Sequence, residues 1–234
     1  LFGKKFKYPI FAGPVGAVQL HYGDKYTEEE YNNIMLKSCN DSGIASFTGD
    51  GVNPNVMIAA TNMIKKQNGM GIPTVKPWNI DIIKEKMKLV ADSNAFAVAM
   101  DIDGAGLPFL KNLTPKAGSK TVEELREIKE IANRPFIIKG VMTAKGAIKA
   151  RESGADAIIV SNHGGRVLDQ CAATAEVLPE IVDAVGGTIK ILVDGGIRSG
   201  ADILKALGIG ADGVVIARTF VIALYGGGEE GVKS

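Results

Sequence analysis

One short segment of this sequence combines a titratable ring with a guanidinium group. Residues 161–166 read Ser-Asn-His-Gly-Gly-Arg, and His163 is one of two histidines among the 234 residues. Imidazole changes charge near neutral pH, so His163 is suited to act as a general base. Arg166 offers a planar fork of N–H donors that can bind a carboxylate through two bonds. The segment therefore predicts proton abstraction from a substrate that carries a carboxylate.

A second segment predicts an anion site. Residues 194–200 read Asp-Gly-Gly-Ile-Arg-Ser-Gly and lead directly into a helical pattern. Backbone N–H groups at such a turn, together with the N-terminus of the helix, attract phosphate. Arg198 in this segment and Arg218 further along can each fork onto phosphate oxygens. We therefore expect a phosphate-bearing ligand here.

Two more charged residues end runs that are otherwise apolar. Asp101 follows Ala95 to Met100, and Lys139 follows Pro135 to Ile138. Burying either charge without a partner would cost several kcal/mol, so both predict a polar site rather than a core. Asp101 is expected to orient His163 and to favour the imidazolium form that follows proton uptake.

Eight short β-rich runs position these residues. The runs are Tyr8 to Ala12, Gly43 to Phe47, Gly71 to Lys76, Ala95 to Asp101, Pro135 to Lys139, Ala157 to Val160, Ile189 to Val193 and Gly213 to Ile216. Helical patterns separate them and begin with capping boxes such as Thr27-x-x-Glu30 and Thr121-x-x-Glu124. This alternation predicts one α/β domain over residues 1–234, a (β/α)8 TIM barrel whose chemistry sits at the strands' C-terminal ends. A doubly wound open sheet is the alternative, although it normally uses five or six strands.

Composition restricts the partners and the setting. Lysine and arginine number 27 against 26 aspartate and glutamate, a net charge of +1, which gives no field to hold nucleic acid or an anionic membrane. The apolar runs are too short to span a bilayer. Two distant cysteines, Cys39 and Cys171, and an opening at Leu1 without a signal peptide predict a cytoplasmic protein with no disulfide framework and no metal site.

The motifs resemble those of the FMN-dependent 2-hydroxy acid oxidases and dehydrogenases, the glycolate oxidase and lactate oxidase type. The resemblance is densest over residues 134–231 and reaches back to residues 9–14, Pro-Ile-Phe-Ala-Gly-Pro. It implies an FMN cofactor and the removal of two electrons from a 2-hydroxy acid to give a 2-keto acid. By analogy with the family, it also implies a homo-oligomer, a tetramer or larger.

The resemblance also assigns roles. His163 matches the catalytic base that contacts substrate, Asp101 the carboxylate paired with it, and Arg166 the ligand of the substrate carboxylate. Lys139 matches the lysine at the flavin N1 and O2 edge, where it would stabilise negative charge. The other positions expected to bind the cofactor are Gly13, Thr48, Ser161, Asp194, Gly195, Gly196, Arg198, Ala217 and Arg218.

The sequence also departs from the family. Residues 72–75, Ile-Pro-Thr-Val, stand where the family has Gln-x-Tyr, and no arginine follows Asp101 until Arg126. The family's N-terminal helical segment, with its own tyrosine, is expected to be missing. Either Lys76 or Trp78 is expected to fill part of the vacated wall, unless the substrate is different and larger. Two alternatives remain: another FMN barrel, resembling type 2 isopentenyl diphosphate isomerase or IMP dehydrogenase, and a non-catalytic barrel that binds flavin.

Overall fold

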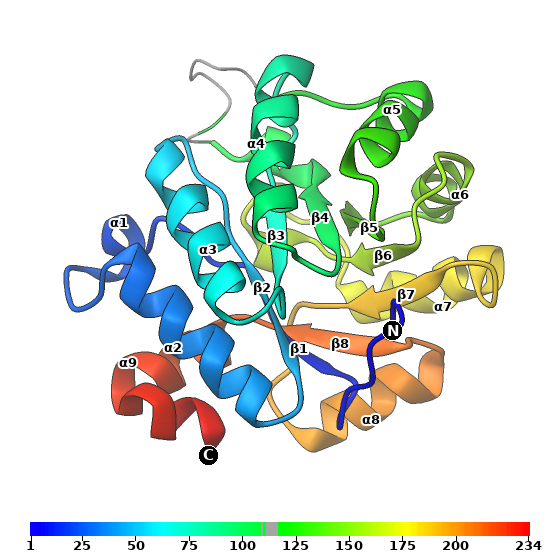
Figure 1. Cartoon of the computed structure of the whole chain (residues 1–234). Coiled ribbons are helices and arrows are strands. Elements are labelled where there is room, and N and C mark those ends of the chain that lie inside the picture. The colour runs from blue at the N-terminus through cyan, green and yellow to red at the C-terminus, as the bar shows by residue number, and fades with distance from the viewer. Residues whose placement is uncertain (109, 111–116) are drawn as a thin grey trace.

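A closed barrel of parallel strands forms the centre of the molecule (Figure 1). The computed structural model describes residues 1–108, 110 and 117–234. Within these residues eight strands follow one another around the barrel in chain order, and β1 pairs with β8 to close it. The strands are β1 (Ile10–Ala12), β2 (Ala45–Thr48), β3 (Ile72–Val75), β4 (Val98–Asp101), β5 (Phe136–Val141), β6 (Ala157–Val160), β7 (Lys190–Val193) and β8 (Gly213–Ile216). The predicted (β/α)8 barrel is confirmed.

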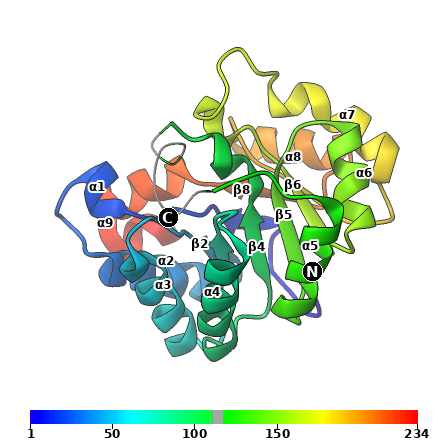
Figure 2. The ribbon, with the colours of Figure 1, turned by 90° about the horizontal axis from the view of Figure 1, so that it is seen from above.

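Helices surround the barrel, as the view from above shows (Figure 2). They are α1 (Val18–Tyr22), α2 (Glu28–Asp41), α3 (Pro54–Lys66), α4 (Ile80–Asp92), α5 (Val122–Ala132), α6 (Ala144–Glu152), α7 (Thr174–Val185), α8 (Gly200–Ile209) and α9 (Arg218–Lys233), with short 3-10 helices η1 (Ile102–Gly106) and η2 (His163–Gly165). Both predicted capping boxes are present, at Thr27 before α2 and at Thr121 before α5. Each satisfies two backbone N–H groups that the first turn leaves unpaired.

The two-residue period of the strands explains why polar side chains gather at one end of the barrel. One buried cluster takes alternate strand residues, among them Phe11, Phe47, Ile72, Ala99, Ile137, Ile159, Leu192 and Val215. Residues between them, such as Val98 and Ile138, belong to a separate cluster that includes residues of the helices. Two positions beyond Ala99, Ile137 and Leu192 come Asp101, Lys139 and Asp194. The same period that fills the core therefore directs these charges toward the barrel's mouth.

One strand end differs from the prediction. Lys139 was expected to end the fifth strand, but β5 continues to Val141 and its register with β6 shifts between Lys139 and Val141. Gly140 lies in this irregularity with φ +102°, a backbone conformation that side-chain-bearing residues rarely adopt. The charge of Lys139 therefore indicates that this residue lies at the barrel's mouth. It does not indicate where the hydrogen-bonded part of β5 ends.

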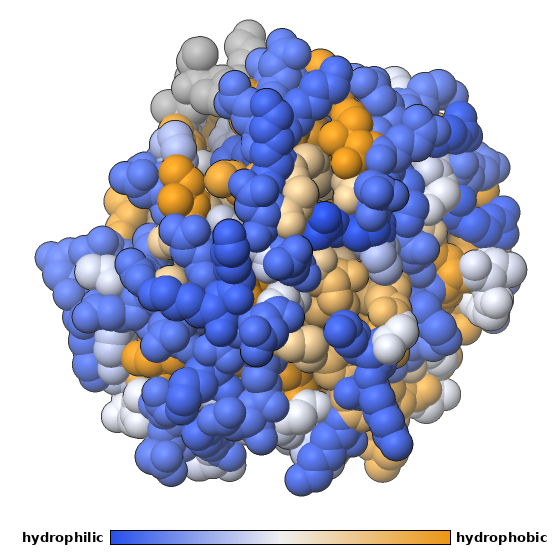
Figure 3. All heavy atoms as spheres, viewed as in Figure 1, coloured by the Kyte–Doolittle hydropathy of each residue, from blue (hydrophilic) through white to orange (hydrophobic). Residues whose placement is uncertain are grey.

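The face of the molecule shown in Figure 1 is mainly hydrophilic (Figure 3). Hydrophobic residues on this face form separate small areas rather than one continuous patch. Scattered exposed apolar side chains of this kind are normal for a folded domain. Among the residues that the structure describes, no helix has the length and apolar character needed to cross a membrane.

Candidate active site

A cavity of about 1070 Å³ opens at the mouth of the barrel. This is at the upper end of the range for small-molecule sites, which leaves room for a cofactor and a substrate together. The predicted site residues that line it are Asp101, Lys139, His163, Arg166, Asp194, Gly195, Gly196, Arg198, Ala217 and Arg218. Of the other three, Gly13, Thr48 and Ser161, none is among the described residues that line the cavity. Thr48 follows Phe47, so the strand period turns it away from the barrel axis.

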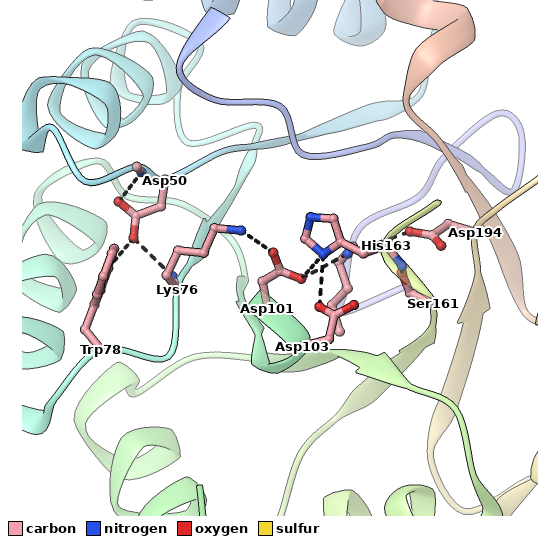
Figure 4. A network of polar contacts seen from close by, with 10 residues as sticks. Asp50, Lys76, Trp78, Asp101, Asp103, Ser161, His163 and Asp194 are labelled. Carbon is pink, nitrogen blue, oxygen red and sulfur yellow. Dashed lines mark hydrogen bonds and ion pairs between the residues drawn. The ribbon is translucent and has the colours of Figure 1, made fainter. Parts of the chain in front are cut away.

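Asp101, a buried aspartate that lines the cavity, has a lysine ammonium on each carboxylate oxygen, and Figure 4 shows its contact with Lys76. Lys139 Nζ lies 3.0 Å from Asp101 Oδ1, and Lys76 Nζ lies 2.5 Å from Asp101 Oδ2. Burial alone would raise the pKa of Asp101, but the two ammonium groups outweigh it and hold that pKa well below its usual range. Burial likewise opposes the charge on Lys139, yet Asp101 and Asp103 raise its pKa. Both charges therefore persist in the barrel.

The imidazole of His163 contacts two carboxylates rather than one. Its Nδ1 lies 3.1 Å from Asp103 Oδ1 and 3.5 Å from Asp101 Oδ1. Asp101, the predicted partner, is thus within reach, but Asp103 is nearer and was not predicted. The hydroxyl of Ser161 lies outside the cavity lining and accepts a hydrogen bond from the His163 N–H at 3.2 Å. Ser161 therefore steadies the backbone of the histidine.

The loop that carries His163 turns through three left-handed residues. His163 has φ +56°, Gly164 +67° and Gly165 +77°. Glycine adopts this conformation freely, whereas for histidine it costs on the order of 1 kcal/mol. The two glycines thus explain the local sequence, and the strained residue is the one that carries the imidazole. Such strain is characteristic of functional positions.

Two buried polar atoms, one in β3 and one directly after β7, have no hydrogen-bond partner among the described residues. They are Asp194 Oδ1 and Thr74 Oγ1, and both residues line the cavity. Burial raises the pKa of Asp194, against the effect of the Lys139 ammonium 3.9 Å away. An unsatisfied buried polar group costs about 1–3 kcal/mol. A bound molecule with both donor and acceptor groups would therefore stabilise this wall.

Part of the predicted anion site already has a partner within the chain. The carboxylate of Asp202 already accepts bonds from the backbone N–H groups of Arg198 and Ser199, at 3.0 and 2.9 Å, so the N-terminus of α8 is internally capped. Helix α9 begins at Arg218. Among the described residues no side chain caps its first turn, whose N–H groups and positive dipole end suit an anion.

Another carboxylate that the sequence did not predict, Asp50, holds the chain after β3. Asp50 accepts hydrogen bonds from Lys86 Nζ at 2.7 Å, from Trp78 Nε1 at 2.7 Å and from the Lys76 backbone N–H at 3.0 Å. Trp78 is thereby buried behind the wall and is not among the described residues lining the cavity, whereas Lys76 is. Of the two residues expected to fill the vacated wall, Lys76 is the one that faces the cavity.

Asp101, Asp103 and His163 place ligand atoms within 4.8 Å of one another, a spacing that a metal ion could also use. However, both oxygens of Asp101 are already bound by lysine ammonium groups. These cations would repel a metal ion. The contacts therefore favour an ion-pair network at this position.

Comparison with known proteins decides the family. Residues 65–234 match the model of the family described as FMN-dependent dehydrogenase. The chain belongs to that family. It is 50% identical over 114 residues to the peroxisomal (S)-2-hydroxyacid oxidase GLO3 of Arabidopsis thaliana and 51% identical over 110 residues to an L-lactate dehydrogenase of Pectobacterium atrosepticum. These matches cover 49% and 47% of this chain, but only 31% and 28% of the two relatives.

Solved structures resemble the whole chain of this family member. A mandelate oxidase structure superposes with a TM-score of 0.81 at 25% identity, covering 100% of this chain and 72% of that one. A mandelate oxidase variant with a monooxide FMN adduct gives a TM-score of 0.77 at 28% identity with the same coverage. These structures therefore share the barrel fold of this chain along its full length.

Proposed function

We propose that this chain carries out the FMN-dependent oxidation of a 2-hydroxy acid to a 2-keto acid. The observation that carries the proposal is the meeting of His163, Arg166 and the Asp101–Lys139 pair in one cavity, which also contains the uncapped start of α9. Membership of the FMN-dependent dehydrogenase family supports the cofactor. The oxidase and lactate dehydrogenase among the relatives support the substrate class.

The residues present fit FMN. Arg218 and the free N–H groups at the start of α9 would hold the phosphate. The unsatisfied Thr74 and Asp194 oxygens suit the polar groups of the ring and ribityl chain. Lys139, buried and charged, would face the ring edge where negative charge collects. When bound, FMN supplies the two-electron acceptor of the reaction.

His163 and Arg166 would handle the substrate. The guanidinium of Arg166, exposed toward the cavity, binds the carboxylate and fixes the direction of the neighbouring hydroxyl. With a carboxylate at Nδ1, His163 has Nε2 free to take a proton from the substrate. The imidazolium that results lies beside Asp101 and Asp103, which stabilise it.

The nature of the acid depends on the wall formed by Lys76. Its ammonium stands at the cavity but is bound to Asp101, so it supplies hydrogen bonds with little net charge. We therefore favour a 2-hydroxy acid with a single carboxylate, bound by Arg166. The cytoplasmic setting and the homo-oligomer expected from the sequence stay predictions.

Anaerobic mixing of the FMN-loaded protein with a panel of 2-hydroxy acids tests the proposal. Loss of the visible flavin absorption with at least one acid is expected, and it should be abolished in His163→Ala. In Arg166→Ala the acid should bind roughly 10 to 150-fold more weakly, because a charge-assisted contact contributes about 1.5–3 kcal/mol. Arg151→Ala, an exposed arginine on α6, is the matched control and should behave as the parent does.

The outcomes separate the alternatives. Tight FMN binding without reduction by any acid would favour a non-catalytic flavin-binding barrel. Failure to bind FMN at all would refute the proposal. Reduction that survives in His163→Ala would refute the role of the histidine while leaving the reaction standing.

A further inference from the structure

A carboxylate that follows β4 by two residues makes the shortest contact to the histidine ring. Asp103 lies in η1, and its Oδ1 is 3.1 Å from His163 Nδ1. The corresponding distance from Asp101 Oδ1 is 3.5 Å, at the limit of a hydrogen bond. The side chain of Asp103 is 12% exposed, so water competes little for this contact.

Asp101 is committed to other partners. Its Oδ1 is 3.0 Å from Lys139 Nζ, and its Oδ2 is 2.5 Å from Lys76 Nζ. Hydrogen bonds between charged groups are about twice as strong as neutral ones, so the two ammonium groups outcompete a neutral imidazole N–H for these oxygens. Asp103 makes no ion pair with a lysine among the described residues. Its Oδ1 is therefore the better acceptor for the imidazole.

The backbone of β5 makes room for Asp103. A Cβ atom built on Gly140 would lie 2.6 Å from Asp103 Cγ and 2.8 Å from its Oδ1, closer than real Cβ contacts. Gly140 is also the residue at φ +102° within the register shift beside Lys139. The position of the Asp103 carboxylate therefore requires a residue without a side chain at Gly140, within the irregularity of β5.

We propose that Asp103 is a positioning residue that fixes the proton of the neutral imidazole on Nδ1 of His163, so that Nε2 is left as the proton acceptor. Asp101 holds the two lysines and is not required for this tautomer. The inference on the tautomer stands on geometry alone, while its catalytic consequence rests on the proposed function.

The charges around the ring agree with this division. Asp101 from β4, Lys139 from β5 and Lys76 after β3 face Asp103 and the ring, and Asp194 lies beyond Lys139. Arg218 packs against the loop at Gly164, where a Cβ would lie 3.0 Å from its Nη2. Burial raises the pKa of Asp103 and the neighbouring Asp101 carboxylate adds to the rise, while Lys139 and His163 act against it. Proton uptake by His163 would place its positive charge beside the carboxylates of Asp101 and Asp103.

Nitrogen-15 NMR of imidazole-labelled protein measures the tautomer directly, without cofactor or substrate. The chain has two histidines, so His21→Gln assigns the two sets of signals. In the parent protein above neutral pH, the proton should reside on Nδ1 of His163. In Asp103→Asn the amide can donate to Nδ1, and the proton should move to Nε2. In Asp101→Asn it should stay on Nδ1.

A proton that stays on Nδ1 in Asp103→Asn, or that moves in Asp101→Asn, would overturn the proposal. Because this readout needs neither FMN nor an acid, it can succeed or fail independently of the proposed reaction. Asp183→Asn, an exposed aspartate on α7, is the matched control and should leave the His163 signals in place.

Flavin reduction gives the second readout. Asp103→Asn should slow reduction at saturating acid by about 100-fold, the lower end of what general base catalysis contributes, with less than about a threefold change in acid affinity. Gly140→Ala perturbs the same contact without removing either carboxylate, so it keeps the test open if Asp103→Asn fails to fold. A folded Gly140→Ala protein with an unchanged tautomer and an unchanged rate would count against the proposal.

Discussion

Replacing Asp50 with alanine should remove the support of the chain after β3. Asp50 is 7% exposed, and its carboxylate accepts hydrogen bonds from the Lys86 ammonium, the Trp78 ring N–H and the Lys76 backbone N–H. Removing one partner of a buried ion pair costs about 3–5 kcal/mol because the other charge is left uncompensated. The Lys86 side chain is 11% exposed, so solvent relieves little of this cost. We expect Asp50→Ala to lower the free energy of unfolding by about 4 kcal/mol.

Urea unfolding, followed by circular dichroism and by fluorescence, measures the effect. Trp78 is the single tryptophan, so its emission reports on this network itself. Adding Lys86→Met to Asp50→Ala removes the stranded charge and should restore at least about 1 kcal/mol. Asp183→Ala on the exposed side of α7 should change stability by no more than about 0.5 kcal/mol. A loss below about 1 kcal/mol in Asp50→Ala would show that this reasoning about the buried pair is wrong.

Three further measurements test other features. The folded-state pKa of Asp101 lies below its usual value near 3.8, so its contribution to stability is complete above that value and is lost as pH falls through the folded pKa. The difference in unfolding free energy between the parent and Asp101→Asn should therefore shrink below about pH 4 and stay constant between about pH 5 and 7; a difference that grows on acidification would contradict the sign. Burial raises the pKa of Cys39 to about 12, so a thiol reagent should label the half-buried Cys171 in the folded protein and Cys39 only after unfolding, as mass spectrometry would reveal. Gly164→Ala should destabilise the protein by about 1 kcal/mol and weaken FMN binding, because φ is +67° there and the new methyl group meets the Arg218 guanidinium; unchanged FMN affinity by titration would argue against Arg218 as a phosphate ligand.

The barrel could be predicted from the sequence because the strand runs, the helical patterns and the helix capping boxes all indicate the same alternation of strands and helices. The predicted strands are right in number and order, but the sequence predicts strand starts at Tyr8, Gly43 and Ala95, two or three residues before the ladder begins. Strand-like composition begins before the first paired residues, so composition alone does not mark the boundary. The predicted end of the fifth strand, Lys139, lies two residues before the end of β5. A glycine-centred irregularity in a strand leaves only a weak signal in the sequence.

The candidate site was predicted where charge interrupts an apolar run, and missed where it does not. Asp101 and Lys139 have that signature, and they form the ion pair at the barrel's mouth. Asp103 sits among glycines in a segment that reads as a solvated loop, and Asp50 lies in a Gly-Asp-Gly turn, so neither differs in sequence from an ordinary surface residue. Their importance depends on which distant groups the fold brings to them, Gly140 for the first and Lys86 for the second.

The pairing of β1 with β8 also bears on the order of events during protein synthesis. Residues 10–12 leave the ribosome early and must wait for residues 214–216 before the cylinder can close. Until then the sheet has two unpaired edges, and such edges are prone to associate with other chains. Asp101, Lys139 and His163, which lie in or directly after β4 to β6, are made before that moment, whereas Arg218, which packs against the His163 loop, follows β8. A ribosome-bound chain that stops short of β8 should therefore depend on chaperones and lack a formed pocket.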